Sequence, residues 1–427
     1  MPIREDVLVV GGGIAGAASA ISAARTGASV RLVTHKKSTL RHASGLIDVL
    51  GFLPGSDDPI VYPYSALSDL PDEHPYSVVG ENAVREGLDL FDDIAGDAYR
   101  GGHTGKNALV ATHGGTVKPT ARYPKGAAEG LASTNRDTLL VGFRSLPDFD
   151  ASVACEHLAA AGAPFAVDGV QVDFPGDFRA DAKVTRYAKA LDRNETVSAF
   201  GKERPAREAL AEAVRPHLDG AERVGFPALL GDAHADEVRS DLSSELGAAV
   251  YEIPMGPPSL PGLRLEDLLF DALDEAGVRI SSGNPVVDYT PVEGEHRVKS
   301  VTVDRNNQRV PLHADEFVLA TGGLVGKGIT SDRESVSEPV FDLYVPHPED
   351  RYDWWDQQAF GDHAFAAFGV VPDEELRPTD ADGEVEFDNL RAAGGVVGGA
   401  DFAAEKSGSG VSLATGYLAG RTAGEAI

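Results

Sequence analysis

The stretch VLVVGGGIAGAASAISAARTGASVRLVTHKK, residues 7–37, constrains the fold of this chain more than any other. An apolar run, VLVV, is followed by Gly11, Gly13 and Gly16, which satisfy the spacing G-x-G-x-x-G. The residues after Gly16 are mostly small and are typical of a closely packed helix. Gly11 permits a tight turn, Gly13 lets the backbone approach a phosphate, and Gly16 lets the helix pack closely against the strand. The N–H groups at the start of that helix attract an anion. The stretch therefore predicts a strand–turn–helix–strand unit of the kind that binds dinucleotides.

The end of the second strand of this unit departs from the usual pattern. The strand at 30–33 runs into Thr34 and His35, where such units usually carry Asp or Glu to bind the adenosine ribose. A carboxylate at that place has ribose hydroxyls to bind only if the ligand has an adenosine half. The missing acid therefore bears on which ligand the unit holds.

Two further glycine-rich stretches indicate a ligand that is flat as well as phosphorylated. In LATGG, 319–323, an apolar strand ends at Thr321 and Gly322, which would bring the backbone close beside such a ligand. The stretch at 392–427 predicts a strand, a glycine loop and a final helix, with Gly395, Ser409 and Gly410 near a ring. A helix N-terminus beside a flavin pyrimidine would stabilise the negative charge that develops on reduction. With the first unit, these stretches predict a flavin-binding fold built from both ends of the chain.

Length and composition limit the class of protein. A chain of 427 residues suggests two domains, and 42% hydrophobic residues can form a large core. No run approaches the ~20 apolar residues that cross a bilayer, and Arg4, Glu5 and Asp6 do not resemble the start of a signal peptide. The single cysteine, Cys155, allows neither an internal disulfide nor an iron–sulfur cluster. We expect a cytoplasmic protein that reaches a membrane only through a partner.

The net charge of −29 is dispersed along the chain instead of being gathered in a tail. A highly hydrated acidic surface of this kind is typical of proteins from a high-salt cytoplasm, where ions screen the self-repulsion. A specific basic partner is the alternative. Direct binding of nucleic acid is disfavoured because neutralising phosphates requires a basic face.

These patterns predict an α/β fold with a Rossmann-like flavin-binding domain that is discontinuous in sequence. We assign residues 1–50, 260–330 and 385–427 to this domain, including a helix at 265–276. Residues 51–259 and 331–384 would form an inserted α+β cap that contacts substrate or partners.

The three motifs resemble those of the two-domain flavoproteins that include the fumarate reductase and succinate dehydrogenase flavoprotein subunits. A closer resemblance is to the B subunits of anaerobic glycerol-3-phosphate dehydrogenases. It rests on the stretches STLRHASGLIDVLGFLP, HPYSVV, PPSLPGLRL, FGVVPDEELRP and GGVVGGADFAAEKSGSGVS. It runs from one end of the chain to the other, although the region between about 100 and 240 contributes little to it.

This resemblance implies an activity and partners. The family oxidises sn-glycerol 3-phosphate to dihydroxyacetone phosphate as a complex of three subunits and passes electrons to quinone, with fumarate or nitrate as terminal acceptor. The A subunit carries FAD, the B subunit carries FMN, and the C subunit carries iron–sulfur clusters and contacts the inner face of the membrane. Because FMN lacks adenosine, the missing acid at Thr34 favours FMN, although the Thr34 hydroxyl leaves FAD open.

Oxidation of an alcohol on a flavin requires a base for the hydroxyl proton. His42, in the loop RHASG that follows the first unit, is our candidate base, and a surface or structural histidine is the alternative. Ser44 and Gly45 in the same loop are candidates for binding the phosphate or the ring of the cofactor.

A phosphorylated substrate also requires cations. Arg264 in PGLRLEDLL and Arg377 in DEELRP match positions in the resembling stretches, and guanidinium groups bind phosphates with two hydrogen bonds. Each could instead pair with a neighbouring acid such as Glu266 or Glu375. The histidines show no metal-ligand spacing, so we expect no metal site.

Two other functions remain open at the level of the sequence. The chain could relay electrons or act as a scaffold while the FAD-carrying A subunit oxidises the alcohol. It could also be an independent FAD-dependent oxidoreductase that acts on a small hydroxy acid.

The acidic composition generates a first prediction. If the −29 charge is an adaptation to high salt, the thermal unfolding midpoint will rise steeply between low and molar KCl, because the ions screen carboxylate repulsion. Differential scanning calorimetry across a KCl series measures this midpoint. A midpoint that does not change with KCl would favour the specific basic partner instead.

Overall fold

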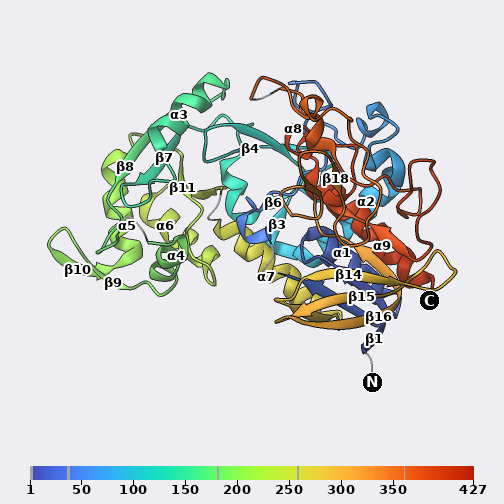
Figure 1. Ribbon diagram of the computed structural model, residues 1–427. Helices are drawn as coiled ribbons and strands as arrows, with labels where there is room; N and C mark the ends of the chain where they lie inside the picture. Colours follow the sequence, from blue (N-terminus) through green and yellow to red (C-terminus); the bar gives the residue numbers. More distant parts are fainter. Residues whose placement is uncertain (1–2, 36–38, 180–181, 257–258, 360) are drawn as a thin grey trace. The chain divides into compact units, whose positions relative to one another are not determined.

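The computed structural model describes residues 3–35, 39–179, 182–256, 259–359 and 361–427. The chain divides into two compact units, each with its own sheet (Figure 1). The first unit comprises Met1–Thr39, Ile47–Gly96 and Asp267–Ile427. The second comprises Leu40–Leu46 and Asp97–Glu266. The division between them falls within helix α7, Leu260–Glu275.

A seven-stranded sheet forms the centre of the first unit. Its order is β13-β2-β1-β16-β15-β14, and β19 pairs with the end of β16. The strands β13, β2, β1, β16 and β19 run parallel, whereas β14, β15 and the first half of β16 form an antiparallel meander. The bounds are β1 Ile3–Val10, β2 Val30–Thr34, β13 Arg279–Ser282, β14 Val286–Pro291, β15 Val298–Arg305, β16 Gln308–Leu319 and β19 Leu390–Ala392.

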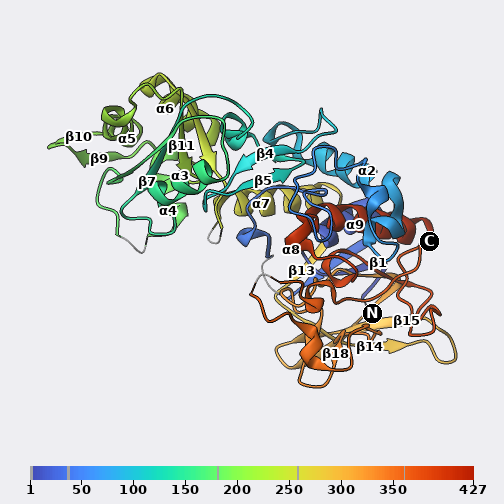
Figure 2. The ribbon, with the colours of Figure 1, turned by 90° about the horizontal axis from the view of Figure 1, so that it is seen from above.

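Helices α1 (Ile14–Arg25) and α9 (Gly408–Glu425) pack against each other and against this sheet. Their backbones approach closely through small residues: a Cβ on Gly416 would lie 2.6 Å from the carbonyl oxygen of Ala15, and one on Gly420 would lie 2.6 Å from the Cα of Ser19. Helix α2 (Pro75–Ala95), kinked at Gly80, packs on α9, beside which it also appears in Figure 2. The two ends of the chain are therefore held together by a helix pair that depends on glycine.

The opposite face of the sheet is covered by irregular chain. Alternate residues of β1 and β16, such as Leu8 and Phe317, pack with Phe341, Trp354 and Val370 in one buried cluster. Short elements occur in this unit: β17 Thr330–Ser331, β18 Val336–Ser337, α8 Phe402–Glu405 and the 3₁₀ turns η2 Leu67–Asp69, η6 Arg351–Trp354, η7 Ala364–Ala367 and η8 Gly394–Val396. Segment 331–384 is thus part of the core of this unit.

The second unit contains a four-stranded parallel sheet in the order β12-β11-β7-β8. Helices α3 to α6 accompany it, and three two-stranded ladders complete the unit. The bounds are β3 Tyr99–Arg100, β4 Ala108–Ala111, β5 Val117–Thr120, β6 Tyr123–Pro124, β7 Thr138–Phe143, α3 Ala151–Ala160, β8 Val167–Val172, α4 Val184–Asp192, β9 Thr196–Ala199, β10 Lys202–Pro205, α5 Ala206–Val214, β11 Arg223–Pro227, α6 Ala235–Leu246 and β12 Ala249–Ile253. The 3₁₀ turns η4 Lys125–Gly130 and η5 Arg215–His217 lie in this unit, whereas η1 Thr39–His42 and η3 Gly96–Ala98 each begin at the last residue of a first-unit segment.

The units differ from the domains that we expected from the sequence. Segments 51–96 and 331–384, which we assigned to the cap, lie in the first unit, and 40–46 lies in the second. The reason is packing, because α2 contacts α9 and residues such as Phe341 share a core with β1. Helix α7 begins at Leu260 instead of 265, since proline is tolerated in the first turn of a helix.

The close packing of α1 on α9 generates the second prediction. We expect Gly420→Ala to lower the free energy of unfolding by about 1–3 kcal/mol, because the added methyl would overlap the backbone of Ser19. Chemical denaturation in molar KCl measures the change. The control is Thr422→Ala on the same helix, which should stay within about 0.5 kcal/mol of the wild type. A Gly420→Ala protein as stable as the wild type would show that the two helices can separate without cost.

Candidate functional site

The glycine turn after β1 has the geometry that its spacing predicts. Gly11 has φ +124°, and a side chain there would collide with the carbonyl oxygen of Ala320. A side chain on Gly16 would collide with the carbonyl oxygen of Gly11. In contrast, a Cβ on Gly13 would meet nothing within 4 Å, and no side chain caps the N-terminus of α1 there. The first N–H groups of α1 therefore face open space that can hold an anion.

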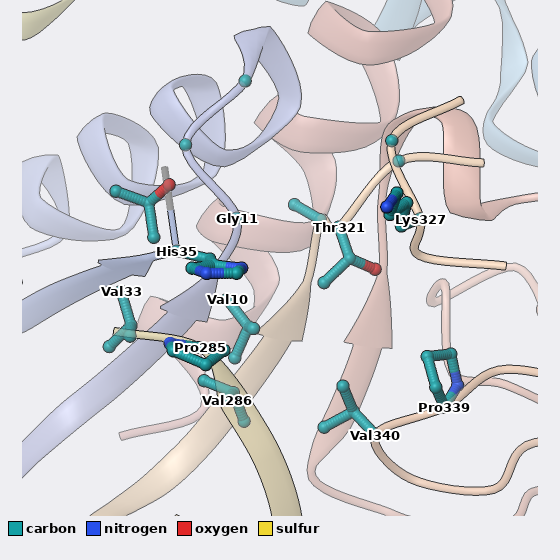
Figure 3. Close-up of a pocket in the computed structure, with 16 residues that line it drawn as sticks. Val10, Gly11, Val33, His35, Pro285, Val286, Thr321, Lys327, Pro339 and Val340 are labelled. Atoms are coloured by element: carbon teal, nitrogen blue, oxygen red, sulfur yellow. The ribbon is translucent and has the colours of Figure 1, made fainter. Parts of the chain in front are cut away.

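This space belongs to a pocket of about 370 Å³ at the carboxyl ends of the parallel strands (Figure 3). In this view Val33 and His35 lie to the left, and Thr321 and Lys327 to the right. The lining residues are Val10, Gly11, Gly12, Gly13, Val33, Thr34, His35, Pro285, Val286, Ala320, Thr321, Gly322, Gly326, Lys327, Pro339 and Val340. Ligands of open parallel sheets bind at this edge.

Thr321 supplies the observation that points most directly to a ligand. Its Oγ1 is buried and has no hydrogen-bond partner among the residues that the structure describes. The backbone continues into Gly322, at φ +80°, and a Cβ on Gly323 would lie 2.7 Å from the carbonyl oxygen of Gly395. Since a buried hydroxyl without a partner is costly, a polar group of a bound molecule is the natural partner for Thr321.

Thr34 ends β2 and lines the pocket. It is buried, and its side chain packs against Gly12, where a Cβ would lie 2.9 Å from the Thr34 Oγ1. Among the described residues that line the pocket, none is Asp or Glu. A ribose at this strand end would therefore have a hydroxyl to bind instead of a carboxylate.

The predicted residues near the start of α9 contact another part of the same unit. The Ser409 Oγ accepts the N–H of Asp48 at 2.7 Å. A Cβ on Gly410 would lie 2.6 Å from the carbonyl oxygen of Asp48 and would collide with the hydroxyl of Tyr76. Gly395 lies in the turn η8 and is half-buried, and neither it, Ser409 nor Gly410 is among the described residues that line the pocket. Ser409 and Gly410 therefore hold segment 48–49 against α9.

A buried polar network beside these residues was missed by the sequence analysis. His74 Nδ1 accepts the N–H of Tyr76 at 3.0 Å, so the proton of the neutral ring lies on Nε2, which donates to Glu405 at 3.1 Å. The Ser407 hydroxyl donates to the same carboxylate at 2.9 Å, and the N–H of Asp401 donates to its other oxygen at 2.9 Å. The stretches HPY and AAEKS contain His74, Glu405 and Ser407, but their separation of about 330 positions conceals the contact.

A second buried carboxylate lies just before the pocket residues Pro339 and Val340. Burial raises the pKa of Glu338 to about 7, although hydrogen bonds from the N–H groups of Phe341 and Val340 oppose the shift. Those bonds, at 2.7 and 3.0 Å, fix the loop that closes one side of the pocket. Glu338 therefore shapes the pocket without lining it.

The predicted loop residues His42, Ser44 and Gly45 belong to the second unit, whereas all lining residues of the pocket belong to the first. His42 is exposed. The Ser44 Oγ accepts the N–H of Leu46 at 3.4 Å. Gly45 has φ +78°, and a Cβ there would lie 2.7 Å from Pro261. Their roles in binding or catalysis stay predictions.

Arg264 is held in an ion pair. Its guanidinium binds both carboxylate oxygens of the buried Glu252, at 2.7 and 3.1 Å, and also the carbonyl oxygen of Gly231. Burial would raise the pKa of Glu252, but Arg264 and Arg239 outweigh this effect, so the carboxyl is more acidic than usual. The expected alternative of an acidic neighbour is realised, although by Glu252 instead of Glu266.

Arg377 is also paired. It donates from Nε and Nη2 to one oxygen of Asp373 at 2.9 and 2.7 Å, and Glu375 lies 3.7 Å away. The hydrogen bond to Asp373 raises the pKa of the guanidinium. Both cations that we predicted for a substrate phosphate are therefore neutralised by carboxylates in this structure.

The described residues contain no cluster of three or more His, Cys, Asp or Glu side chains that could hold a metal ion. In the same part of the chain, no helix combines the length and the apolar character needed to cross a bilayer.

Comparisons with known proteins place the chain among flavoproteins. The family model described as "FAD binding domain" matches residues 6–411. A Halobacterium salinarum protein, named as a probable B subunit of anaerobic glycerol-3-phosphate dehydrogenase, is 61% identical over 427 residues, which cover 100% of this chain and 99% of that protein. The B subunit of the anaerobic glycerol-3-phosphate dehydrogenase of Vibrio cholerae is 31% identical, covering 98% of this chain and 96% of that protein.

Among solved structures, the 3-ketosteroid delta1-dehydrogenase of Sterolibacterium denitrificans aligns with 99% of this chain and 100% of its own, at 12% identity and a TM-score of 0.46. The family assignment rests on the sequence relatives and the family model, which extend over almost the whole chain. The chain belongs to the FAD binding domain family of flavoproteins and, within it, to the B subunits of anaerobic glycerol-3-phosphate dehydrogenases.

Proposed function

We propose that this chain is the flavin-carrying B subunit of an anaerobic glycerol-3-phosphate dehydrogenase complex that oxidises sn-glycerol 3-phosphate to dihydroxyacetone phosphate. The observation that carries the proposal is the pocket, where the open N-terminus of α1 meets a buried Thr321 hydroxyl without a partner. The substrate comes from the names of the relatives at 61% and 31% identity.

A bound flavin would supply the acceptor for the two electrons of the alcohol. The chain itself supplies the binding groups. The N–H groups after Gly13 hold the cofactor phosphate, Thr321 binds a polar atom of the cofactor, and the glycines at 11 and 16 let the backbone come close enough. His42 remains our candidate to take the hydroxyl proton.

The proposed flavin is FMN. The absence of a carboxylate among the described lining residues supports it, because FMN has no adenosine ribose to bind. FAD is the alternative, for which Thr34 would bind the ribose through its hydroxyl, and the description of the matching family favours it.

The proposal includes partners and a route for the electrons. A single cysteine cannot hold an iron–sulfur cluster, so electrons that leave through such a cluster require another polypeptide. We assign this role to the C subunit, which would lie at the inner face of the membrane and pass the electrons to quinone, and we place a second flavin, FAD, in the A subunit. The second unit, 97–266 with 40–46, is the candidate cap or partner-contact domain.

A second candidate function is electron relay or scaffolding, with the alcohol oxidised in the FAD-carrying A subunit. The specific observation in its favour is that Arg264 and Arg377 both bind carboxylates, which leaves neither guanidinium available for a substrate phosphate in this structure. Oxidation of another small hydroxy acid by the chain alone is the third possibility.

The third prediction concerns the cofactor. The chain purified in molar KCl should release FMN in about 1:1 ratio on denaturation, because the pocket offers phosphate groups a helix N-terminus but offers ribose no carboxylate. Chromatography and mass spectrometry identify the released molecule. Release of FAD would correct the cofactor and make Thr34 a ribose ligand, and a chain that neither contains nor takes up flavin would overturn the proposed function.

The fourth prediction separates catalysis on this chain from relay. In the purified complex, His42→Ala should lower glycerol-3-phosphate-dependent reduction of an acceptor dye by about 100-fold or more while the flavin is retained, because the base is lost. The matched control is His103→Ala, an exposed histidine of the same unit, which should leave turnover unchanged.

Unchanged turnover in His42→Ala would favour the relay function. A wild-type complex that reduces no dye with glycerol 3-phosphate would refute the substrate. Turnover of a small hydroxy acid by this chain without partners would instead support the independent oxidoreductase.

A further inference from the structure

The turn that follows Thr321 presents a lysine in an unusual backbone conformation. Lys327 has φ +63°, in the left-handed region that non-glycine residues rarely adopt. Its N–H donates to the carbonyl oxygen of Leu324, and the N–H of Gly328 donates to that of Gly323, both at 3.2 Å. Such conformations persist where the surrounding structure enforces them, and they are concentrated at functional sites.

The two glycines that flank this lysine, Gly326 and Gly328, let the turn pack closely against Thr321. A Cβ on Gly326 would lie 2.8 Å from the carbonyl oxygen of Thr321, and one on Gly328 would collide with the Thr321 hydroxyl. Lys327 is therefore held beside the strand end that carries the buried Oγ1 without a partner. Both residues line the same pocket as Gly11, Gly12 and Gly13.

The charge of Lys327 distinguishes it within the pocket. It is the only lysine or arginine among the described lining residues, and no described carboxylate forms an ion pair with it. Arg264 and Arg377 show how readily cations are paired in a chain that carries 67 Asp and Glu residues against 38 Lys and Arg. An exposed lysine without such a partner, on the wall of a pocket that also contains the N-terminus of α1, is available to a ligand.

We infer that Lys327 and the Thr321 hydroxyl bind the phosphate of the flavin, opposite the N–H groups at the start of α1. The inference rests on the proposed function, since it assigns residues to the flavin that this function requires. The ammonium group would make a charge-assisted hydrogen bond to a phosphate oxygen, and the hydroxyl would donate to another. The pocket would then combine a helix N-terminus, a hydroxyl and one positive side chain around the phosphate.

A series of flavins that differ in their phosphates tests this inference directly and gives the fifth prediction. The deflavinated full-length chain is titrated with FMN, FAD and riboflavin, and quenching of flavin fluorescence gives each dissociation constant. Lys327→Gln should weaken FMN and FAD about tenfold, as expected for one charge-assisted hydrogen bond, and should leave riboflavin unchanged because it has no phosphate. Thr321→Val should act in the same direction on the same two ligands.

Two control variants separate charge from backbone strain and folding. Lys299→Gln removes an exposed lysine of β15 in the same unit that does not line the pocket, and it should change no affinity. Lys327→Gly also removes the charge but suits the positive φ, so it should weaken FMN as Lys327→Gln does while the unfolding midpoint stays level or rises.

The outcomes are distinguishable. If the wild-type chain binds FMN or FAD and the Lys327 variants bind them equally well, the phosphate role is wrong while the proposed function stands. If Lys327→Gln weakens riboflavin as much as FMN, the lysine contacts some other part of the flavin, and the role is also wrong. If the wild-type chain binds no flavin, both this inference and the proposed function are overturned.

Discussion

The close approach of backbones around the first turn of α1 is the constraint on which the first unit depends. Gly11 lies against Ala320 at the end of β16, Gly16 lies against Gly11, and the glycines of α9 lie against the other side of α1. A side chain at Gly11 would displace the end of β16, one at Gly16 would displace the glycine turn, and one at Gly416 or Gly420 would displace α1. Because β16 and α9 come from the last third of the chain, the same contacts that seat the N-terminal turn also bring the carboxyl end of β16 beside it. The pocket is a consequence of this packing.

Buried hydrogen bonds fix the start of α9, which the glycines bring close to α1. The carboxylate of Glu405 accepts from His74, Ser407 and the backbone of Asp401, and the Ser409 hydroxyl binds segment 48–49. Buried polar groups are tolerated only when their hydrogen bonds are made, so these partners specify one position for the start of α9. Among the described residues that line the pocket, only the Thr321 hydroxyl is buried without a hydrogen-bond partner. A buried polar group of this kind is expected where a ligand supplies the missing hydrogen bond.

The glycine spacing, the strands that flank it and the Thr-Gly end of β16 could be predicted from the sequence, because each depends on neighbours within a few positions. The network of His74 with Glu405 could not, since its members are far apart in the chain. Arg377 pairs with Asp373, only four positions earlier, so this ion pair could have been predicted from the sequence. Arg264 pairs with Glu252, twelve positions earlier and across a proline-rich loop, and local spacing does not predict that pair. The unit boundaries also depend on tertiary contacts, because α2 and segment 331–384 are held in the first unit by what they pack against.

The negative charge of the chain limits which groups can bind an anion at the pocket. In a chain of net charge −29, an anionic cofactor meets a repulsive field unless local groups overcome it. Most cations of the described structure lie in ion pairs with carboxylates away from the pocket, as Arg31 and Arg279 both do with Glu5. What remains at the pocket is the N-terminus of α1, which carries about half a positive charge, and the ammonium of Lys327. Binding of a phosphate there, as we propose, would depend on short-range groups, and short-range contacts are the electrostatic interactions that molar salt screens least.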